Sequence, residues 1–497
     1  MTTYNVTNAT ELSSAIASAA GGDKIVVADG NYGKLNIFNR DFSSTVTIMA
    51  ANPGGGVHFD GLNISASDNV NLVGVDLGRA LNAGEPDYTQ LNSISNASNI
   101  KLSQVTVHGS MDGDPTNDGI GLMVRNVAGF SISDSSFSDL YRGIIVQQCT
   151  NTTIQDNDIT LIRSDGIISI ANQGLSIQGN HIGEFHPKLG DHADAIQFWN
   201  TNQTVGQSNI TIKDNVIFQT YFSGVEQTGI QGIFMSDPRE YGYQNVLIQN
   251  NALYSNDAYN GIYVNGATGV QILDNTVVSK STDGKMFWID VLNSADISVQ
   301  NNVTDRVITS NVTNYFESGN VNFLADPAAR DLFPNLANPT QLEDLLTSGV
   351  GFQLPEGGAS DLPPPSDVPP PSDIPPPSDV PPPSDVPPVE TLPPAPDLPP
   401  DGGAAVTVQG DDNDNILGLG ATASQLSGEA RAETMYGYRG NDMYFVDHAG
   451  DVVIEATNEG NDRVASSISY ALAATSAIER LEAIDLASTT AIDLTGN

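Results

Sequence analysis

Short segments in which apolar and polar residues alternate recur through the middle of the chain. One family of segments includes NTTIQDNDIT, GLSIQGNHIG and NVLIQNNALY, with an asparagine at the same place in each. Alternation with a period of two is typical of β-strands that bury one face. Six asparagines share this place, at spacings of 23, 35, 36, 24 and 27 residues: Asn157, Asn180, Asn215, Asn251, Asn275 and Asn302.

A second family of strands lies between these segments and includes DGIISIA, DAIQFWN, QGIFMSD and NGIYVNG. Each is entered through a Gly, Ala or polar turn. Two or more strands in every repeat of about 23 residues predict a parallel β-helix. We expect the asparagines to stack as a ladder at one corner, where their side chains tolerate αL geometry and bond the backbone along the stack.

The N-terminal stretch ATELSSAIASAAGGDKIVVADGNY has helical spacing up to its Gly-Gly pair, followed by an apolar strand. An amphipathic helix at this place would cover the open end of a β-helix core. The stretch resembles the N-terminal cap of the right-handed β-helix polysaccharide lyases. The resemblance extends as architecture over about residues 3–320. It implies the fold, whereas lyases, hydrolases and epimerases share this scaffold.

Two composition changes divide the chain. Residues 362–400 repeat PPPSD followed by Val or Ile, which predicts a polyproline II spacer because proline cannot donate ladder hydrogen bonds. We expect a catalytic β-helix domain over 1–355, a Pro-rich linker over 356–404 and a third region over 405–497. The fold class is therefore all-β: a right-handed parallel β-helix with an N-terminal capping helix, a linker and a C-terminal β-roll.

The third region contains VQGDDNDNILGLG and MYGYRGNDMYFVDHAGDVVIEA, which resemble the Gly- and Asp-rich nonapeptide repeats of RTX proteins. The copies are degenerate, because full GGxGxD tandems are missing. The resemblance implies a β-roll that binds Ca²⁺ and export through a type I secretion apparatus with an uncleaved C-terminal signal. The expected calcium ligands are Asp412, Asp414, Asn441 and Asp442.

Charge and composition narrow the classes of partner. The formal charge is −40, with 59 acidic against 19 basic residues, so the surface disfavours nucleic acid and anionic membranes and attracts divalent cations. No apolar run approaches the roughly 20 residues of a membrane span. The chain begins with a polar stretch rather than a signal peptide, and its lone cysteine, Cys149, excludes an intramolecular disulfide. Together with the RTX resemblance, these features predict a secreted protein.

Alignment of the second strand family predicts an outward row of side chains along one face. Its members are Gly121, Ile145, Ile168, Gln197, Phe234, Tyr263 and Trp288, and Trp199 belongs to the next row. Outward aromatic side chains are best explained by a covering partner. We expect Gln197, Trp199, Phe234, Tyr263 and Trp288 to bind sugar rings, with Lys285 nearby. The two longest repeats insert loops beside these same rungs, as functional loops do on a rigid scaffold.

The inserted segments concentrate residues suited to β-elimination from a uronic acid, which needs a base on the C5 proton and a cation at the carboxylate. We expect His192 or Lys188 as the base, Arg239 or Arg163 as the cation, and a tyrosine such as Tyr241 as the acid. Lys285 is a further candidate. The leading prediction is a polysaccharide lyase acting on an acidic, uronate-containing polymer, with Ca²⁺ as a further means of bridging the charges in the groove.

Three alternatives stay open. Asp165 and Asp194 occupy the same turn on consecutive rungs, which faintly resembles the polygalacturonase pattern of an inverting hydrolase. The GHG and RIK elements of that family are absent, and turn capping also explains these aspartates together with Asp118. A C5-epimerase would use the same groups as the lyase. A non-catalytic carbohydrate-binding adhesin is the third alternative.

Overall fold

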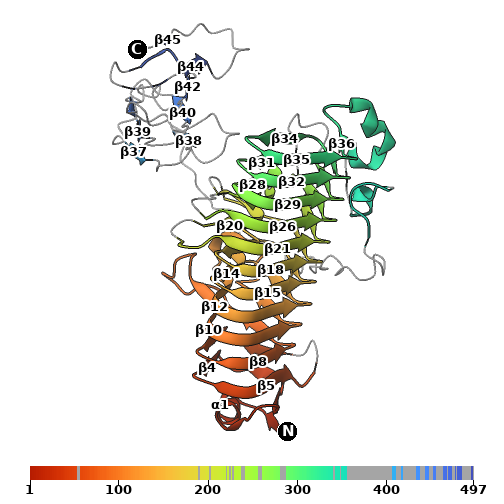
Figure 1. Cartoon of the computed structure of the whole chain (residues 1–497). Coiled ribbons are helices and arrows are strands. Elements are labelled where there is room, and N and C mark those ends of the chain that lie inside the picture. The colour runs from red at the N-terminus through yellow and green to blue at the C-terminus, as the bar shows by residue number, and fades with distance from the viewer. Residues whose placement is uncertain are drawn as a thin grey trace, which may run out of the picture. The chain divides into compact units, whose positions relative to one another are not determined.

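The computed structural model (Figure 1) divides into two compact units, Met1–Val368 and Pro369–Asn497. The boundary between them falls inside the predicted linker. In the first unit the structure describes residues 1–52, 56–188, 191–200, 203–219, 221–222, 225–226, 229–236, 241–255, 260–279, 287–337, 339, 342–347 and 349–354. In the second unit it describes residues 406–409, 416–417, 433–436, 443–446, 452–454, 463–466, 468–472, 476, 478, 480–483 and 494–495.

The first unit is a parallel β-helix with three faces. The first and second faces form one 22-stranded sheet, and the third is a 12-stranded sheet. The first face contains β4 (Lys34–Phe38), β7 (Gly61–Ser65), β14 (Arg142–Gln147), β17 (Ile167–Ile170), β20 (Asp194–Trp199), β25 (Gln231–Met235), β28 (Asn260–Asn265), β31 (Trp288–Leu292) and β34 (Val307–Ser310). Two long strands, β10 (Gln90–Ser103) and β12 (Ile120–Ser133), belong to both the first and the second face.

The remaining strands of this unit complete the coil. The second face contains β1 (Thr3–Val6), β2 (Lys24–Val27), β5 (Asp41–Ala50), β8 (Asp68–Val73), β15 (Thr150–Gln155), β18 (Gln173–Gln178), β21 (Gln207–Lys213), β26 (Tyr243–Gln249), β29 (Ala267–Leu273), β32 (Ala295–Gln300) and β35 (Thr313–Ser318). The third face contains β3 (Gly30–Asn31), β6 (Val57–Phe59), β9 (Asp76–Gly78), β11 (Thr106–His108), β13 (Ser136–Ser138), β16 (Asp158–Ile159), β19 (His181–Gly183), β22 (Val216–Gln219), β27 (Ala252–Ser255), β30 (Thr276–Val278), β33 (Val303–Thr304) and β36 (Val321–Asn322). A short antiparallel pair, β23 (Tyr221–Phe222) and β24 (Val225–Glu226), lies between β22 and β25 in the chain. Four 3-10 helices are η1 (Pro115–Asn117), η2 (Pro327–Leu332), η3 (Pro334–Ala337) and η4 (Leu342–Leu345).

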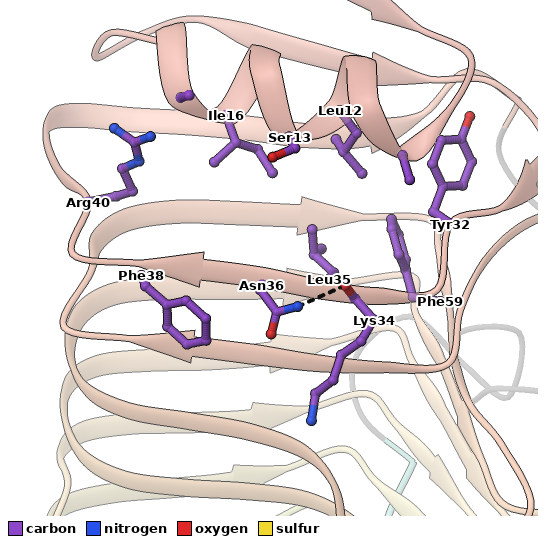
Figure 2. Close-up of a pocket in the computed structure, with 12 residues that line it drawn as sticks. Leu12, Ser13, Ile16, Tyr32, Lys34, Leu35, Asn36, Phe38, Arg40 and Phe59 are labelled. Atoms are coloured by element: carbon purple, nitrogen blue, oxygen red, sulfur yellow. Dashed lines mark hydrogen bonds between the residues drawn. The ribbon is translucent and has the colours of Figure 1, made fainter.

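The predicted capping helix is present as α1 (Ala9–Ser18), at the N-terminal end of the stack (Figure 1). Asn8 begins it by accepting a hydrogen bond from the backbone N–H of Glu11, which satisfies one free donor of the first turn. Figure 2 shows Leu12 and Ile16 pointing toward the strand that carries Leu35, across a cavity of about 290 Å³. The helix thus covers apolar side chains at the end of the core.

Inward residues of the strands form stacked apolar columns. On the first face, the parallel register aligns one fully buried isoleucine from each of six successive rungs: Ile144, Ile167, Ile196, Ile233, Ile262 and Ile289. Branched side chains fit the pleated surface of a strand and pack against the same residue one rung away. Period-two alternation therefore places these columns in the core.

The predicted asparagine ladder is confirmed as a buried column at the corner before the third face. Asn215 is typical: its Oδ1 accepts from the backbone N–H and the Nδ2 of Asn180, both at 3.0 Å. The Nδ2 of Asn215 in turn donates to Ile177 O and to Asn251 Oδ1, both at 2.9 Å. Each amide thus satisfies the backbone of the neighbouring rung, and Asn320 continues the column beyond the six predicted members.

The αL part of that prediction was wrong by one residue. The ladder asparagines do not have positive φ, whereas the residue before each of them does, at Asp156, Gly179, Asp214, Asn250, Asp274 and Asn301. A left-handed residue turns the chain at the corner, and Asp, Asn and Gly adopt it most readily. The next residue can then direct its amide inward.

The second unit contains short parallel strand pairs. Its strands are β37 (Val406–Gln409), β38 (Ile416–Leu417), β39 (Glu433–Tyr436), β40 (Met443–Val446), β41 (Val452–Ile454), β42 (Arg463–Ser466), β43 (Tyr470–Ala471), β44 (Arg480–Ala483) and β45 (Leu494–Thr495). Tyr444, Val446, Val453 and Val464 form its small core. The predicted calcium ligands Asp412, Asp414, Asn441 and Asp442, like the linker residues 356–404, lie outside the described residues. Calcium binding here stays a prediction.

Across the described part of both units, no helix combines the length and the apolar character that a membrane crossing needs.

Candidate functional site

One outward row of side chains runs along the first face. The strand register aligns Ile145, Ile168, Gln197, Phe234 and Tyr263 on five successive rungs, as predicted. The row departs from the prediction at both ends, where the register adds Met123 rather than Gly121 and Asp290 rather than Trp288. On β31 Asp290 pairs with Tyr263 and Trp288 pairs with Asn260, so Trp288 lies two residues before the row.

The N-terminal part of this row is covered. Met123, Ile145 and Ile168 are buried although they point outward, and they form an apolar cluster with Ile120. Partly buried Tyr141, Ile170 and Trp199 pack against that cluster. Trp199 therefore has a packing role beside its predicted role in sugar binding. Gln197, on the next rung, is buried as well at 8% exposure, although it was predicted to bind sugar, and its Oε1 has no hydrogen-bond partner among the described residues. The row becomes partly exposed at Phe234.

Aromatic rings occupy the following rungs of the row. The ring of Phe234 stacks on that of Tyr263, with centroids 4.7 Å apart and an interplanar angle of 22°. On its other side Phe234 contacts the imidazole of His192, with centroids 5.3 Å apart. The rings of Phe234 and Tyr263 are partly buried. The arrangement is an aromatic stack along the row, in which Phe234 and Tyr263 cover one face of each other.

Beside this row lies a second column made of polar residues at the start of each strand. The register aligns Arg142, Asp165, Asp194, Gln231, Asn260 and Trp288 on six consecutive rungs. Asp165 and Asp194 thus share the same turn on consecutive rungs, as predicted. Sequence reasoning missed Arg142, Gln231 and Asn260. Their signal was present in RGIIV, QGIFM and NGIYV, where each directly precedes the glycine that opens the strand.

Two separate sets of contacts link members of the polar column. Arg142 Nε lies 2.9 Å from Asp165 Oδ2. Gln231 contacts both His192 Nε2 and the Nδ2 of Asn260 through its side-chain amide. Trp288 Nε1 then donates to Asn260 Oδ1 at 3.0 Å. The predicted sugar-binding residue Trp288 is thereby held at the end of the column.

The two aspartates of the column are buried carboxyl groups. Asp165 is 1% exposed and Asp194 is 0% exposed, and the Oδ1 of each has no hydrogen-bond partner among the described residues. Burial, and after it the negative charge of Asp194, raises the pKa of Asp165 against the opposing charge of Arg142. Burial likewise raises the pKa of Asp194, although His192 opposes the shift. The pair therefore holds protons more tightly than free carboxyl groups do.

His192 is the exposed member of the group. Its Nδ1 lies 3.1 Å from Asp194 Oδ2, and its side chain is 56% exposed against 0% for that of Asp194. Burial opposes the charged imidazole, but the carboxylates of Asp194 and Asp165 outweigh that effect and raise the pKa of His192. An imidazole oriented by a carboxylate and open to the groove is suited to proton transfer.

Two other predicted residues, Arg163 and Lys188, bind groups of the protein itself. The guanidinium of Arg163 binds both oxygens of Asp191, at 2.7 and 3.0 Å, and Asp87 at 2.7 Å. Lys188 donates its ammonium to Thr116 O. With two carboxylates already bound, Arg163 joins three loops and has little charge left for a substrate carboxylate, so we leave it out of the proposed site.

Tyr241 is 40% exposed and precedes β26, next to the turn at which Asn200 Nδ2 donates to Gly242 O. His192 precedes β20 and Asn200 follows it, so the length of a strand separates Tyr241 from His192. The structure therefore does not bring these two predicted partners together. Arg239 and Lys285 lie outside the described residues.

Two groups of side chains in the described part of the chain could hold a metal ion. Asp112, Asp118 and Asp139 place carboxylate oxygens within 4.8 Å of one another, and such an all-oxygen set suits Ca²⁺. Asp118 also accepts a hydrogen bond from Ser110 N at 2.6 Å, in agreement with its predicted capping role. The second group is His58, Asp76 and His108, on the third face.

Several solved structures are similar to parts of this chain. A PL6 family polysaccharide lyase from Pseudopedobacter saltans is 15% identical, with a TM-score of 0.38 over 70% of this chain and 98% of that one. A family 28 exopolygalacturonase from Yersinia enterocolitica is 12% identical, with a TM-score of 0.36 over 65% and 78%. A surface adhesin of Streptococcus pneumoniae is 12% identical, with a TM-score of 0.37 over 63% and 86%.

No curated protein matches the chain in sequence. A family model described as a right handed beta helix region matches residues 92–304. The predicted hand and class of the fold are thereby confirmed: the chain contains a right-handed parallel β-helix.

Proposed function

We propose that the protein is an enzyme that cleaves an acidic, uronate-containing polysaccharide by β-elimination, with His192 as the base. The observation that carries the proposal is the pairing of an exposed imidazole with a fully buried carboxylate, Asp194, at the end of a row of partly exposed aromatic rings. A base must reach the substrate, and the group that orients it need not.

In the proposed reaction, the substrate displaces the Gln231 amide from His192 Nε2. Neutral His192 then removes the C5 proton of a uronate residue through Nε2, which faces away from Asp194. The electron pair of the C5–H bond forms the C4–C5 double bond, and the C4–O glycosidic bond breaks. The leaving oxygen takes up a proton from water. Asp194 holds the ring through Nδ1 and stabilises the imidazolium that forms. The rings of Phe234 and Tyr263 would bind neighbouring sugars of the polymer.

The substrate carboxylate needs a cation in a protein of formal charge −40. Arg142 is held at Asp165, two rungs from the His192 rung, so the sequence prediction of Arg239 remains our assignment for this role. Ca²⁺ bound by the groove is the second means of bridging two negative charges. Both would act by lowering the pKa of the C5 proton.

An inverting hydrolase is the second candidate because Asp165 and Asp194 form a carboxyl pair with raised pKa values. Their burial counts against it. The acid and base of a glycosidase must touch the glycosidic oxygen and the attacking water, yet the two side chains are 2% and 0% exposed. An exposed His192 fits proton abstraction better, and a C5-epimerase would begin with the same step.

The test is incubation of the full-length chain with a panel of acidic polysaccharides, including alginate and pectate. Ultraviolet absorbance reports the unsaturated uronate product, and a reducing-end assay reports every cleavage. We expect both signals to rise together with at least one polymer. New reducing ends without the absorbance would establish hydrolysis instead. Neither signal, with any polymer, would leave the epimerase, checked by proton exchange at C5, or the adhesin.

We also propose, from the RTX resemblance, that residues 405–497 bind Ca²⁺ and direct type I secretion. Calcium titration of the chain and of an Asp412→Asn, Asp442→Asn double variant tests the first part. Export in a host with and without a type I apparatus tests the second.

A further inference from the structure

Two histidines and an aspartate from three successive strands of the third face converge at one point. His58 lies on β6, Asp76 on β9 and His108 on β11. His58 Nδ1 lies 2.8 Å from Asp76 Oδ2, and His108 Nε2 lies 3.0 Å from Asp76 Oδ1. The proposed polysaccharide cleavage, on the first face, uses none of these residues.

The outer nitrogen of each ring faces an oxygen that can only accept a hydrogen bond. His108 Nδ1 lies 2.8 Å from Gly109 O, and His58 Nε2 lies 3.3 Å from Asp60 Oδ1. Each ring thus lies between two acceptor oxygens, and a neutral imidazole can donate to only one of them. With the proton on the outer nitrogen, the inner nitrogen directs a lone pair at the Asp76 carboxylate. A cation between the two groups would satisfy both.

Burial keeps water from the His108 side of this cluster. His108 is only 7% exposed, and its Nε2 and the Oδ1 of Asp76 are buried atoms without a hydrogen bond in the described part of the chain. The side chains of His58 and Asp76 are partly exposed. Gly78 leaves the space for the backbone of His108, because a Cβ there would lie 2.0 Å from His108 O. A second proton on an imidazole, or a divalent cation bound by all three side chains, would satisfy the buried atoms.

We propose that His58, Asp76 and His108 bind a divalent transition metal ion of the zinc class. Two imidazole nitrogens and a carboxylate oxygen are ligands that Zn²⁺ prefers, whereas Ca²⁺ and Mg²⁺ prefer all-oxygen sites. Gly109 O and Asp60 serve as the outer partners that fix the ring orientation of metal-binding histidines. Ligand atoms around a tetrahedral zinc lie roughly 3.3 Å apart. The ligand atoms of this set all lie within 4.8 Å of one another, so adjustments of the side chains would complete the site.

The bound ion would join three rungs near the N-terminal end of the solenoid. The strands β6, β9 and β11 are three residues long each, so their ladders supply few hydrogen bonds. An ion that binds the folded state and not the unfolded chain raises the stability of the folded state. We therefore expect zinc to raise the unfolding temperature of the β-helix.

The same face provides a matched control. His181 Nδ1 lies 2.7 Å from Asp158 Oδ1 on the neighbouring strands β19 and β16, but no second histidine completes a set there among the described residues. His181→Gln should thus leave zinc binding unchanged, whereas His58→Gln and His108→Gln remove a ligand.

The experiment is isothermal titration of the full-length chain with Zn²⁺, in buffer that contains Ca²⁺ to fill all-oxygen sites, together with thermal unfolding at each zinc concentration. We expect one tight site in the wild type and in His181→Gln, and an affinity at least about tenfold weaker in His58→Gln and His108→Gln. The zinc-dependent rise in Tm should disappear in the same two variants. His58 is partly exposed, so His58→Gln should disturb the fold less than His108→Gln. If His108→Gln fails to fold, the zinc affinity of His58→Gln tests the proposal.

Three outcomes would overturn the proposal. The first is a wild type that shows no tight zinc site. The second is unchanged affinity in His58→Gln, which would place the ion elsewhere. The third is an equal loss in His181→Gln, which would show that zinc binds histidines on this face without regard to the three-residue set.

Discussion

His192 Nδ1 and Asp194 Oδ2 lie 3.1 Å apart, with the imidazole more than half exposed and the carboxylate fully buried. The two residues are only two positions apart in the chain. His192 lies in an inserted segment, whereas Asp194 is the first residue of β20. The strand fixes the carboxylate, and the carboxylate fixes the ring.

His192→Gln is expected to reduce kcat on the polymer at least ~100-fold, because glutamine has no group that can take the C5 proton. The measurement is the initial rate of unsaturated product at saturating polymer. His181→Gln, on the third face, is the matched histidine control and should keep the wild-type rate. A wild-type rate in His192→Gln would move the base to another residue.

Asp194→Asn is expected to shift the pH dependence of the reaction. The base acts as neutral imidazole, so activity rises as the pH passes the pKa of His192. That pKa is raised in the wild type, which places the acid limb above the ordinary histidine value of about 6.5. Removal of the carboxylate charge should move the limb to lower pH, while orientation is lost and kcat falls.

The profile of kcat/KM against pH measures this shift. Asp165→Asn provides the comparison, since Asp165 acts on His192 only through its charge and should shift the limb in the same direction but less. An acid limb that stays in place in Asp194→Asn would show that His192 is not the titrating base.

Tyr263→Leu is expected to raise KM roughly fivefold with little change in kcat, because it removes a stacking surface without touching the proton-transfer group. Tyr263→Phe keeps the ring and should keep KM near the wild-type value. Steady-state kinetics with polymer and with short oligosaccharides separates the two constants. Equal effects of both variants would mean that the ring face does not bind sugar.

Asn251→Ala is expected to lower the free energy of unfolding of the β-helix by about 2 kcal/mol or more. The substitution leaves the backbone N–H and the Nδ2 of Asn215 without their buried acceptor, Asn251 Oδ1. Asn245 also bonds along the stack, to Asn209 Oδ1 at 3.1 Å, but it is exposed and has a φ of 54°. Asn245→Gly should therefore change the stability by no more than about 0.5 kcal/mol.

Urea unfolding followed by tryptophan fluorescence measures both variants, because the two tryptophans of the chain, Trp199 and Trp288, lie in the β-helix. Equal destabilisation in the two variants would contradict the special role of the buried column.

The asparagine ladder could be predicted from the sequence because a buried amide in a solenoid has to meet the same group one repeat later. The outward row could be predicted in its middle for a related reason, since alternation assigns each residue to a face. At Trp288 the same alternation gave the correct face but the wrong neighbour, because Tyr263 pairs with Asp290. A shift of two residues keeps every side chain on its face, so periodicity does not reveal which outward residues are neighbours.

The sequence by itself determined the class of fold, the capping helix, the buried corner asparagines and the rungs at which inserted loops meet aromatic strands, because all of these follow from local periodicity and repeat length. Only the tertiary structure decided how the chemical groups are paired. It placed Arg163 between Asp87 and Asp191, separated Tyr241 from His192, and brought His58, Asp76 and His108 together. Such contacts depend on rung register and on loop paths, which no spacing within one repeat encodes.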